Sequence, residues 1–452
     1  MLFDDTIYGP YDQAEQMAMQ ACEHYEDGQI GQAIEEIDQA LQINPANSCW
    51  HFDKALALDS AGRFDDAISE YEAALDLSPG DVEILNALAI DYTRVGLYDL
   101  AIQTFEQIEQ LDPFFEASYC NRIITYAETG QHELAEQMFY MAQQINPNCP
   151  ICFYNIGNSF FIQRLYKKAI LCWQKTEKLD PNHPQINYRI AQACWADGDI
   201  ESARSFFLEE LRKNAADVEV IGDFGLLLLQ TGDTESAKEK FNRILELNPE
   251  SAAAIFYLGE IAYNSKDTKK AIHLYKQAIE KSGAMPGPRF RLAILSLSAG
   301  QTAKAKAYLA VELQLANDNP DILLSMASIF LKLDDLDSAS NCLLRTIDLA
   351  ASNPDAYYYL GCINILQGRT ENAAELLKKA VELKGQHTAA IVELAYLFLA
   401  ESNFTAALEQ INLLRQICPG DCRLKKLERA YFTKQAGEQL SSFFGRLKFS
   451  SK

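Results

Sequence analysis

Apolar and small residues recur along this chain at a spacing that predicts paired helices. In the stretch DDAISEYEAALDLSP (residues 65–79) the apolar positions lie three and four residues apart, which is typical of one face of an amphipathic helix. An alanine in each such segment returns every 34 residues, twelve times, without an insertion or deletion. These alanines are Ala33, Ala67, Ala101, Ala135, Ala169, Ala203, Ala237, Ala271, Ala305, Ala339, Ala373 and Ala407. The pattern predicts an array of repeats.

Each repeat carries further small residues and turn signals around this anchor alanine. Twelve residues before the anchor, eleven of the twelve repeats have glycine or alanine, and only Ile123 breaks the rule. Small residues at such positions let two helices cross at close range. Five residues before the anchor, a glycine suited to the left-handed end of a helix occurs in eight repeats: Gly28, Gly62, Gly96, Gly130, Gly198, Gly232, Gly300 and Gly368. The fold class is therefore predicted to be all-α, with each repeat a helix, a tight turn and a second helix.

The pattern resembles the tetratricopeptide repeat family. Its signature residues are matched in the third repeat by Leu88, Ala89, Tyr92, Gly96, Ala101, Phe105 and Pro113, and in the eighth by Leu258, Gly259, Ala271, Tyr275 and Ala278. The resemblance implies an α-solenoid of about twelve helix-turn-helix repeats that forms a right-handed superhelix. It also implies a concave groove lined by the first helix of every pair.

The domain organisation predicted from this register has four parts. Residues 1–13 form an N-terminal cap segment, residues 14–283 hold repeats 1–8, residues 284–419 hold repeats 9–12, and residues 420–452 form a C-terminal capping helix with a basic and apolar tail. The boundary between the two groups of repeats rests on SGAMPGPRF (residues 282–290), which is either a flexible junction or part of an uninterrupted solenoid. The tail SSFFGRLKFSSK is either a frayed terminus or a docking segment for a membrane or partner.

The groove-facing positions implied by the resemblance are aromatic, amide and charged residues in the middle of the chain. They are Asn121, Tyr154, Asn155, Asn158, Phe161, Tyr188, Arg189, Gln192, Trp195, Asp223, Phe256, Tyr257, Glu260, Tyr263, Phe290 and Arg291. Aromatic rings give rigid contact area, and asparagine amides pair with an extended peptide backbone. The favoured hypothesis is a non-enzymatic scaffold or adaptor that binds partner peptides or helices in the groove. The alternative for Tyr154, Tyr188 and Trp195 is packing between repeats.

One groove-facing position, fourteen residues before each anchor alanine, forms a row through consecutive repeats. It holds Asp53, Ala87, Asn121, Asn155, Arg189 and Asp223. Some family members carry a ladder of asparagines at this position, and here that ladder is partial.

The negative charge is confined to the first third of the chain. Residues 1–150 contain 28 Asp and Glu but 4 Lys and Arg, whereas the rest of the chain holds 35 and 36, from totals of 63 and 40. The first four repeats are therefore predicted to attract a basic partner and to repel nucleic acid, which is not an expected partner. The alternative is an acidic surface that serves only solubility.

No motif for catalysis or for a cofactor is found, and the chain is predicted not to be an enzyme. The six histidines form no HExxH pair, and neither GxxxxGK[ST] nor GxSxG occurs. The first residues, MLFDDTIYGP, lack the basic and apolar character of a secretory signal, and no stretch is long and apolar enough to span a membrane. A cytoplasmic protein with reduced cysteines is predicted, and self-association stays open.

The remaining alternative is a thiol-redox or metal-binding protein that uses Cys149 and Cys152 in the sequence CPIC. In the next repeat the same positions hold His183 and Ile186, so the pair falls at a junction between repeats. Elsewhere the position of Cys149 holds helix-capping residues: Asn47, Asp81, Asp217, Ser251, Asn319 and Asn353. Cys152 is thus predicted to be a buried small residue and Cys149 a substitute at a helix cap, while the reactivity of the Cys149 thiol stays open. No metal site is predicted, because the spacing supplies no two further ligands.

Overall fold

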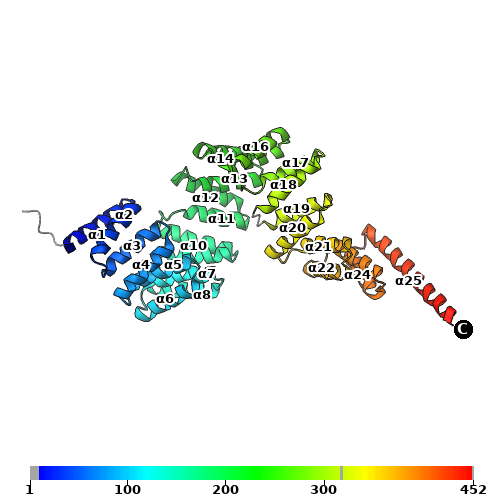
Figure 1. Ribbon diagram of the computed structural model, residues 1–452, viewed down its shortest axis with the longest axis horizontal. Coiled ribbons are helices and arrows are strands. Elements are labelled where there is room, and N and C mark those ends of the chain that lie inside the picture. The colour runs from blue at the N-terminus through cyan, green and yellow to red at the C-terminus, as the bar shows by residue number, and fades with distance from the viewer. Residues whose placement is uncertain (1–9, 316–318, 450–452) are drawn as a thin grey trace, which may run out of the picture. The chain divides into compact units, whose positions relative to one another are not determined.

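The computed structural model describes the backbone of residues 10–315 and 319–449, and the side chains of residues 11–315 and 319–438. These residues form twelve antiparallel helix pairs and a final helix, with no strand among them (Figure 1). The first helices of the pairs are α1 (Pro10–Glu26), α3 (Ser48–Ser60), α5 (Val82–Arg94), α7 (Glu116–Glu128), α9 (Pro150–Ile162), α11 (Ile186–Asp197), α13 (Val218–Gln230), α15 (Ala252–Asn264), α17 (Pro288–Ser298), α19 (Pro320–Lys332), α21 (Pro354–Leu366) and α23 (Thr388–Ala400). The second helices are α2 (Ile30–Ile43), α4 (Phe64–Leu77), α6 (Tyr98–Leu111), α8 (His132–Ile145), α10 (Tyr166–Leu179), α12 (Ile200–Lys213), α14 (Thr234–Leu247), α16 (Thr268–Lys281), α18 (Thr302–Gln314), α20 (Leu336–Leu349), α22 (Thr370–Leu383) and α24 (Phe404–Ile417). The predicted all-α helical-repeat solenoid is confirmed.

Two compact units make up the chain, Met1–Lys240 and Phe241–Lys452. In the first unit each second helix packs against the first helix of the following pair, from α2 on α3 to α12 on α13. In the second unit the same packing recurs, for example α16 on α17 and α22 on α23, and α25 (Cys422–Phe449) covers α23 and α24. The predicted junction at residues 283–288 lies inside the second unit.

The anchor alanines hold the two helices of each pair together. All twelve are at most 2% exposed. Three glycines of the other small column sit directly beneath large side chains, because an added Cβ would come within 3 Å of a neighbour: Gly157 beneath Trp173, Gly259 beneath Tyr275 and Gly361 beneath Leu377. The small residues are therefore required by the close approach of the helices.

Repeat four shows the consequence of a larger residue in this column. Ile123 is completely buried, whereas Phe139, in the position where other repeats bury an aromatic ring, is only half-buried. The Phe139 ring instead lies 5.4 Å from that of Phe153 on α9. The isoleucine side chain occupies space that a glycine or alanine leaves to the ring.

The turn inside every repeat requires one left-handed residue. All eight predicted glycines have φ between +73° and +86°. The four repeats without glycine place another residue at the same position with φ between +57° and +64°: Arg164, Lys266, Asp334 and Ser402. The fold thus imposes this conformation even where the side chain opposes it, at a cost of about 1 kcal/mol per residue.

Arg164→Gly and Lys266→Gly are accordingly expected to raise the free energy of unfolding by about 0.5–1 kcal/mol each, because glycine adopts a positive φ without steric cost. Urea unfolding monitored by circular dichroism measures the change. Gly232→Arg is the reverse exchange, at φ +82° with open space around the Cβ position, and should destabilise by a similar amount. Destabilisation by Arg164→Gly would contradict the explanation.

Capping residues begin the first helices as predicted. The side chains of Asn47, Asp81, Asp217, Ser251, Asn319 and Asn353 accept hydrogen bonds from backbone N–H groups one turn into their helices.

The backbone of α25 is helical to Phe449, and the side chains of the predicted docking tail lie outside the described residues, as does most of the predicted N-terminal cap segment. No helix in the described part of the chain is long and apolar enough to cross a membrane.

Candidate partner-binding surfaces

The first unit contains most of the predicted groove residues, and several of them present partly exposed side chains. They lie on the first helices α7, α9, α11 and α13. The Tyr154 ring is 4.4 Å from that of His183, and the Asn121 side-chain amide donates a hydrogen bond to Asn86 Oδ1 at 3.1 Å. The partly exposed members are Asn121, Tyr154, Asn158, Phe161, Arg189, Gln192, Trp195 and Asp223. We call this set the first-helix row.

Two predicted contact residues of this unit are buried, which corrects their assignment. Tyr188 is 2% exposed, and its hydroxyl donates hydrogen bonds to Asp223 at 2.8 Å and Glu219 at 3.2 Å. Asn155 is 3% exposed, and its amide donates to the Cys120 carbonyl oxygen at 2.8 Å. Both side chains join neighbouring repeats, because their partners lie 31 to 35 residues away, so they do not touch a partner protein in this structure.

Arg189 and Trp195 on α11 are two partly exposed members of the first-helix row. Arg189 contacts Gln192 through one terminal nitrogen at 3.4 Å, and its Nε has no hydrogen-bond partner among the described residues. Trp195 Nε1 donates to Gln230 at 2.6 Å, while its ring lies 6.4 Å from that of Phe207. The Nε atom is itself buried, so only the exposed part of the guanidinium group can meet a partner.

The second unit holds the remaining predicted groove residues, and several of their side chains contact one another. Arg291 forms an ion pair with Glu260 and lies 5.5 Å above the Tyr263 ring. The Phe256 and Tyr257 rings pack 5.3 Å apart. Phe290 belongs to the hydrophobic core, which corrects its prediction as a contact residue, whereas Phe256, Tyr257, Tyr263 and Arg291 remain partly exposed.

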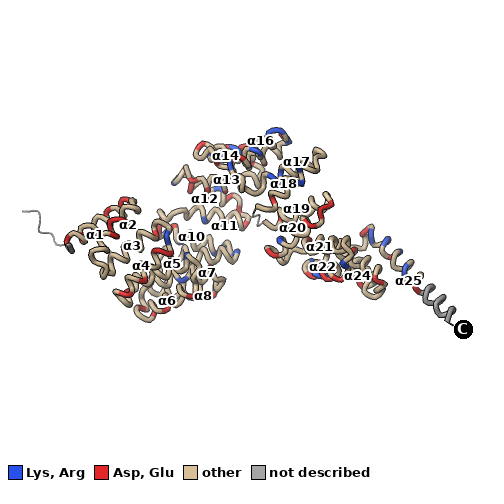
Figure 2. The backbone as a smooth tube through the Cα atoms, viewed as in Figure 1, with Lys and Arg blue, Asp and Glu red and all other residues tan. Residues whose placement is uncertain are grey.

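The acidic character of the first third is not neutralised within the structure. Acidic residues spread over α1–α8 in Figure 2, and basic ones are few. All four basic residues of this region are already paired: Lys54 with Asp38 and Glu70, Arg63 with Asp66, Arg94 with Asp59 and Asp91, and Arg122 with Glu106 and Glu109. The excess carboxylates therefore face solvent or a partner.

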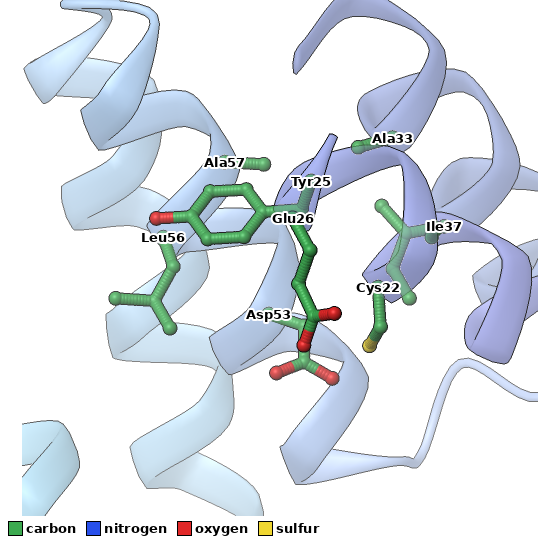
Figure 3. Close-up of a pocket in the computed structure, with 9 residues that line it drawn as sticks. Cys22, Tyr25, Glu26, Ala33, Ile37, Asp53, Leu56 and Ala57 are labelled. Carbon is green, nitrogen blue, oxygen red and sulfur yellow. The ribbon is translucent and has the colours of Figure 1, made fainter. Parts of the chain in front are cut away.

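A cavity of about 160 Å³ opens between α1, α2 and α3 in this acidic region. Its walls are apolar, with Ile37 and Leu56 among the lining side chains. Figure 3 shows the carboxylates of Glu26 and Asp53 pointing toward one another beside the sulfur of Cys22. Burial raises the pKa of Asp53 above its ordinary value. Burial, followed by the charges of Asp53 and Glu26, raises the pKa of the Cys22 thiol.

We call this cavity the acidic pocket. Asp53 in it holds the repeat position that Asn121 and Asp223 hold in later repeats. The sequence placed Asp53 in that register but gave no sign of a cavity. The apolar walls and the second carboxylate come from three different helices, so only the packed structure brings them together.

Cys149 and Cys152 lie at the junction between two repeats, as the 34-residue register predicted. Cys149 caps α9, its sulfur accepting a hydrogen bond from the Cys152 N–H at 3.5 Å, and Cys152 is completely buried. Burial and a hydrogen bond with Glu116 raise the pKa of the Cys149 thiol to about 11, which disfavours the reactive thiolate form. The structure also brings Glu116 and Cys120 of α7 to this pair, two residues that the sequence pattern did not indicate. Cys120 and Cys152 form a disulfide, which corrects the prediction that the cysteines are reduced.

Stacked helix pairs and interhelical surfaces of this kind define the chain as a helical-repeat protein of the scaffold class. The Tetratricopeptide repeat family profile matches residues 18–82, 154–218, 223–286 and 324–388, more than half of the sequence, and a second profile of the same description matches residues 60–119. The chain belongs to the tetratricopeptide repeat family. No curated protein matches it.

Solved structures with a similar chain trace share little sequence. Yeast Tom70 is 13% identical, with 95% of this chain and 96% of that chain covered and a TM-score of 0.41. A chain of the APC/C hetero-tetramer Cut9-Hcn1 is 13% identical, with 92% and 96% covered and a TM-score of 0.39. A tetratricopeptide repeat protein from Parabacteroides merdae ATCC 43184 is 16% identical, with 52% and 93% covered and a TM-score of 0.43.

Proposed function

We propose that this protein is a non-enzymatic scaffold whose acidic first repeats bind a basic segment of a partner protein. The observation that carries the proposal is the acidic pocket within a region where every basic residue is already paired. A lysine or arginine side chain matches the pocket, because its aliphatic stem would contact Ile37 and Leu56 while its charged end met Glu26 and Asp53. The surrounding carboxylates would attract such a segment from solution.

Binding of a fluorescent lysine- and arginine-rich peptide to the full chain tests this function, with anisotropy as the measurement. Glu26→Gln with Asp53→Asn should weaken binding by about tenfold or more, since charged pairs of this kind contribute about 1.5–3 kcal/mol. Asp99→Asn with Glu133→Gln removes the same charge from exposed positions outside the pocket and should have a much smaller effect. Equal losses of peptide affinity in the two double variants would refute binding in the acidic pocket. Peptide binding that is unchanged in molar salt would refute the proposal of a basic partner.

The pH dependence of this binding follows from Asp53. Its pKa in the folded protein is raised by burial, and only the ionised carboxylate attracts a cation. Peptide affinity should therefore begin to fall at a pH above the ordinary range of an aspartate as the solution is acidified. In Asp53→Asn this part of the pH dependence should be absent.

A second candidate is binding of an extended peptide or helix along the first-helix row. The partly exposed side chains of Arg189 and Trp195 favour it, because a guanidinium group can donate to a peptide carbonyl or carboxylate and an indole offers a rigid contact surface. Arg189→Ala with Trp195→Ala should reduce the capture of such a partner, whereas Tyr188→Ala is unsuitable as a test because Tyr188 is buried. Capture that is lost only with the Glu26 and Asp53 changes would assign the function to the acidic pocket instead.

A further inference from the structure

Three cysteines and one glutamate converge where α7 meets the start of α9 in the first unit. The side-chain ligand atoms of Glu116, Cys120, Cys149 and Cys152 all lie within 4.8 Å of one another. The three cysteines are at most 5% exposed, while Glu116 is partly exposed and so leaves a path from solvent. In this structure Cys120 and Cys152 are joined by a disulfide, and the Cys149 sulfur lies 3.7 Å from that of Cys120.

The arrangement has the size of a tetrahedral zinc site. Zinc–sulfur bonds of about 2.3 Å place the sulfur ligands of a tetrahedron about 3.8 Å apart, close to the 3.7 Å between Cys120 and Cys149. Glu116 Oε1 lies 3.0 Å from the Cys120 sulfur and 3.5 Å from the Cys152 sulfur, so a single ion can reach all four groups once reduction lets the Cys120 and Cys152 sulfurs move apart.

The surroundings favour negatively charged ligands. Glu116 is the first residue of α7, and Cys149 caps α9, so two helix N-termini direct their positive ends toward the cluster. The Cys152 N–H points at the Cys149 sulfur at 3.5 Å, and the Asn146 amide lies 3.4 Å from Glu116 Oε2, which orients the carboxylate. Thiolate-rich tetrahedral sites select zinc over hard cations such as magnesium.

We propose that Glu116, Cys120, Cys149 and Cys152 bind one zinc ion when the cysteines are reduced, and that the ion links repeats four and five. The Cys120–Cys152 disulfide and the zinc ion are alternative states of one ligand set, because both use the same two sulfur atoms. A phosphine reductant interconverts them: phosphorus gives two electrons to the S–S bond and takes oxygen from water, whose two protons go to the two sulfurs. Zinc then displaces the three thiol protons into the buffer.

The full chain, reduced with a phosphine, stripped with a chelator and dialysed against zinc, tests the site by metal analysis and by competition with a chromophoric chelator. One zinc ion per chain is expected. Cys120→Ser and Cys152→Ser should weaken binding by more than about a hundredfold, whereas Cys194→Ser, a buried cysteine of the same unit outside the cluster, should leave it unchanged. Glu116→Gln keeps the shape of the side chain and should weaken binding less than loss of a cysteine.

Cobalt(II) reports the identity and geometry of the ligands directly, because the unmodified protein alone gives a diagnostic spectrum. The reduced protein should give thiolate-to-cobalt charge transfer and the intense visible bands of tetrahedral coordination, and both should decrease in Cys149→Ser. Reduced protein that binds no zinc, or zinc binding that survives Cys120→Ser, would overturn the proposal. Loss of zinc with unchanged binding of the basic peptide would leave the scaffold function standing, since the two proposals rest on different residues.

Discussion

Replacing Gly157 by alanine is expected to lower the free energy of unfolding by about 2–3 kcal/mol, because the added methyl group has no room. Its Cβ would lie 2.5 Å from Trp173 Nε1 and 2.7 Å from Cδ1, both atoms of a rigid indole that is 1% exposed. The indole cannot move easily, since Nε1 donates to the Tyr154 carbonyl oxygen at 3.1 Å. Urea unfolding of the full chain measures the loss.

Two further variants separate overpacking from a general effect of alanine. Gly31→Ala places a methyl group in another helix where no atom lies within 4 Å, and it should raise the free energy of unfolding by up to about 1 kcal/mol, because alanine favours the helix over glycine. Gly157→Ala combined with Trp173→Leu recreates the buried pair of Ala293 and Leu309 in repeat nine, and it should recover part of the loss. A double variant whose loss equals the sum of the two single losses would contradict the steric explanation.

Glu312→Ala is expected to lower the free energy of unfolding by about 3 kcal/mol. The buried Glu312 side chain on α18 caps the N-terminus of α17, a neighbouring helix of the second unit. Glu312 is completely buried, and its carboxylate accepts hydrogen bonds from the backbone N–H groups of Gly287, Arg289 and Phe290. Alanine would leave these donors buried without a partner. Through Gly287 this carboxylate contacts the candidate junction at residues 283–288, and hydrogen-exchange protection there should fall together with stability in Glu312→Ala.

An exposed glutamate of the same unit is the control. Glu382 pairs with Lys379 at 3.2 Å and is 66% exposed, so Glu382→Ala should cost less than about 0.5 kcal/mol. Burial raises the pKa of Glu312 in the folded protein, so its contribution to stability is fully present below the ordinary pKa of a glutamate and decreases as the pH rises through the raised value. The cost of Glu312→Ala should accordingly be larger in acid than at neutral pH, and the opposite trend would contradict this assignment.

Much of the fold could be predicted because its determinants are local or strictly periodic. The anchor alanines, the capping side chains and the left-handed glycines each act within one turn or one helix pair, so their spacing was enough to place them. Arg164 and Lys266 show the limit of this approach. Nothing in their side chains indicates a positive φ, and the conformation follows from the closure of the same turn in all twelve repeats.

The candidate sites were less predictable because they depend on contacts between repeats. The register put Tyr188 on the groove-facing side, but Asp223, 35 residues further along, accepts its hydroxyl hydrogen bond, and the side chain is buried. Cys120 stands 32 residues from Cys152 and matches no metal-binding spacing, yet helix packing joins their sulfurs. A linear pattern does not show which side chains of adjacent repeats meet.

The sequence by itself determined the helix pairs, their turns, their caps and the concentration of acidic residues in the first four repeats. A fixed 34-residue period and short-range sterics specify these features without reference to distant residues. Only the tertiary structure decided which polar residues are exposed to a partner. It also brought Glu26 and Asp53 into one pocket and placed Glu116 and Cys120 beside the CPIC pair. These outcomes depend on the side chains that the neighbouring repeat supplies, because burial and coordination are properties of the packed interface.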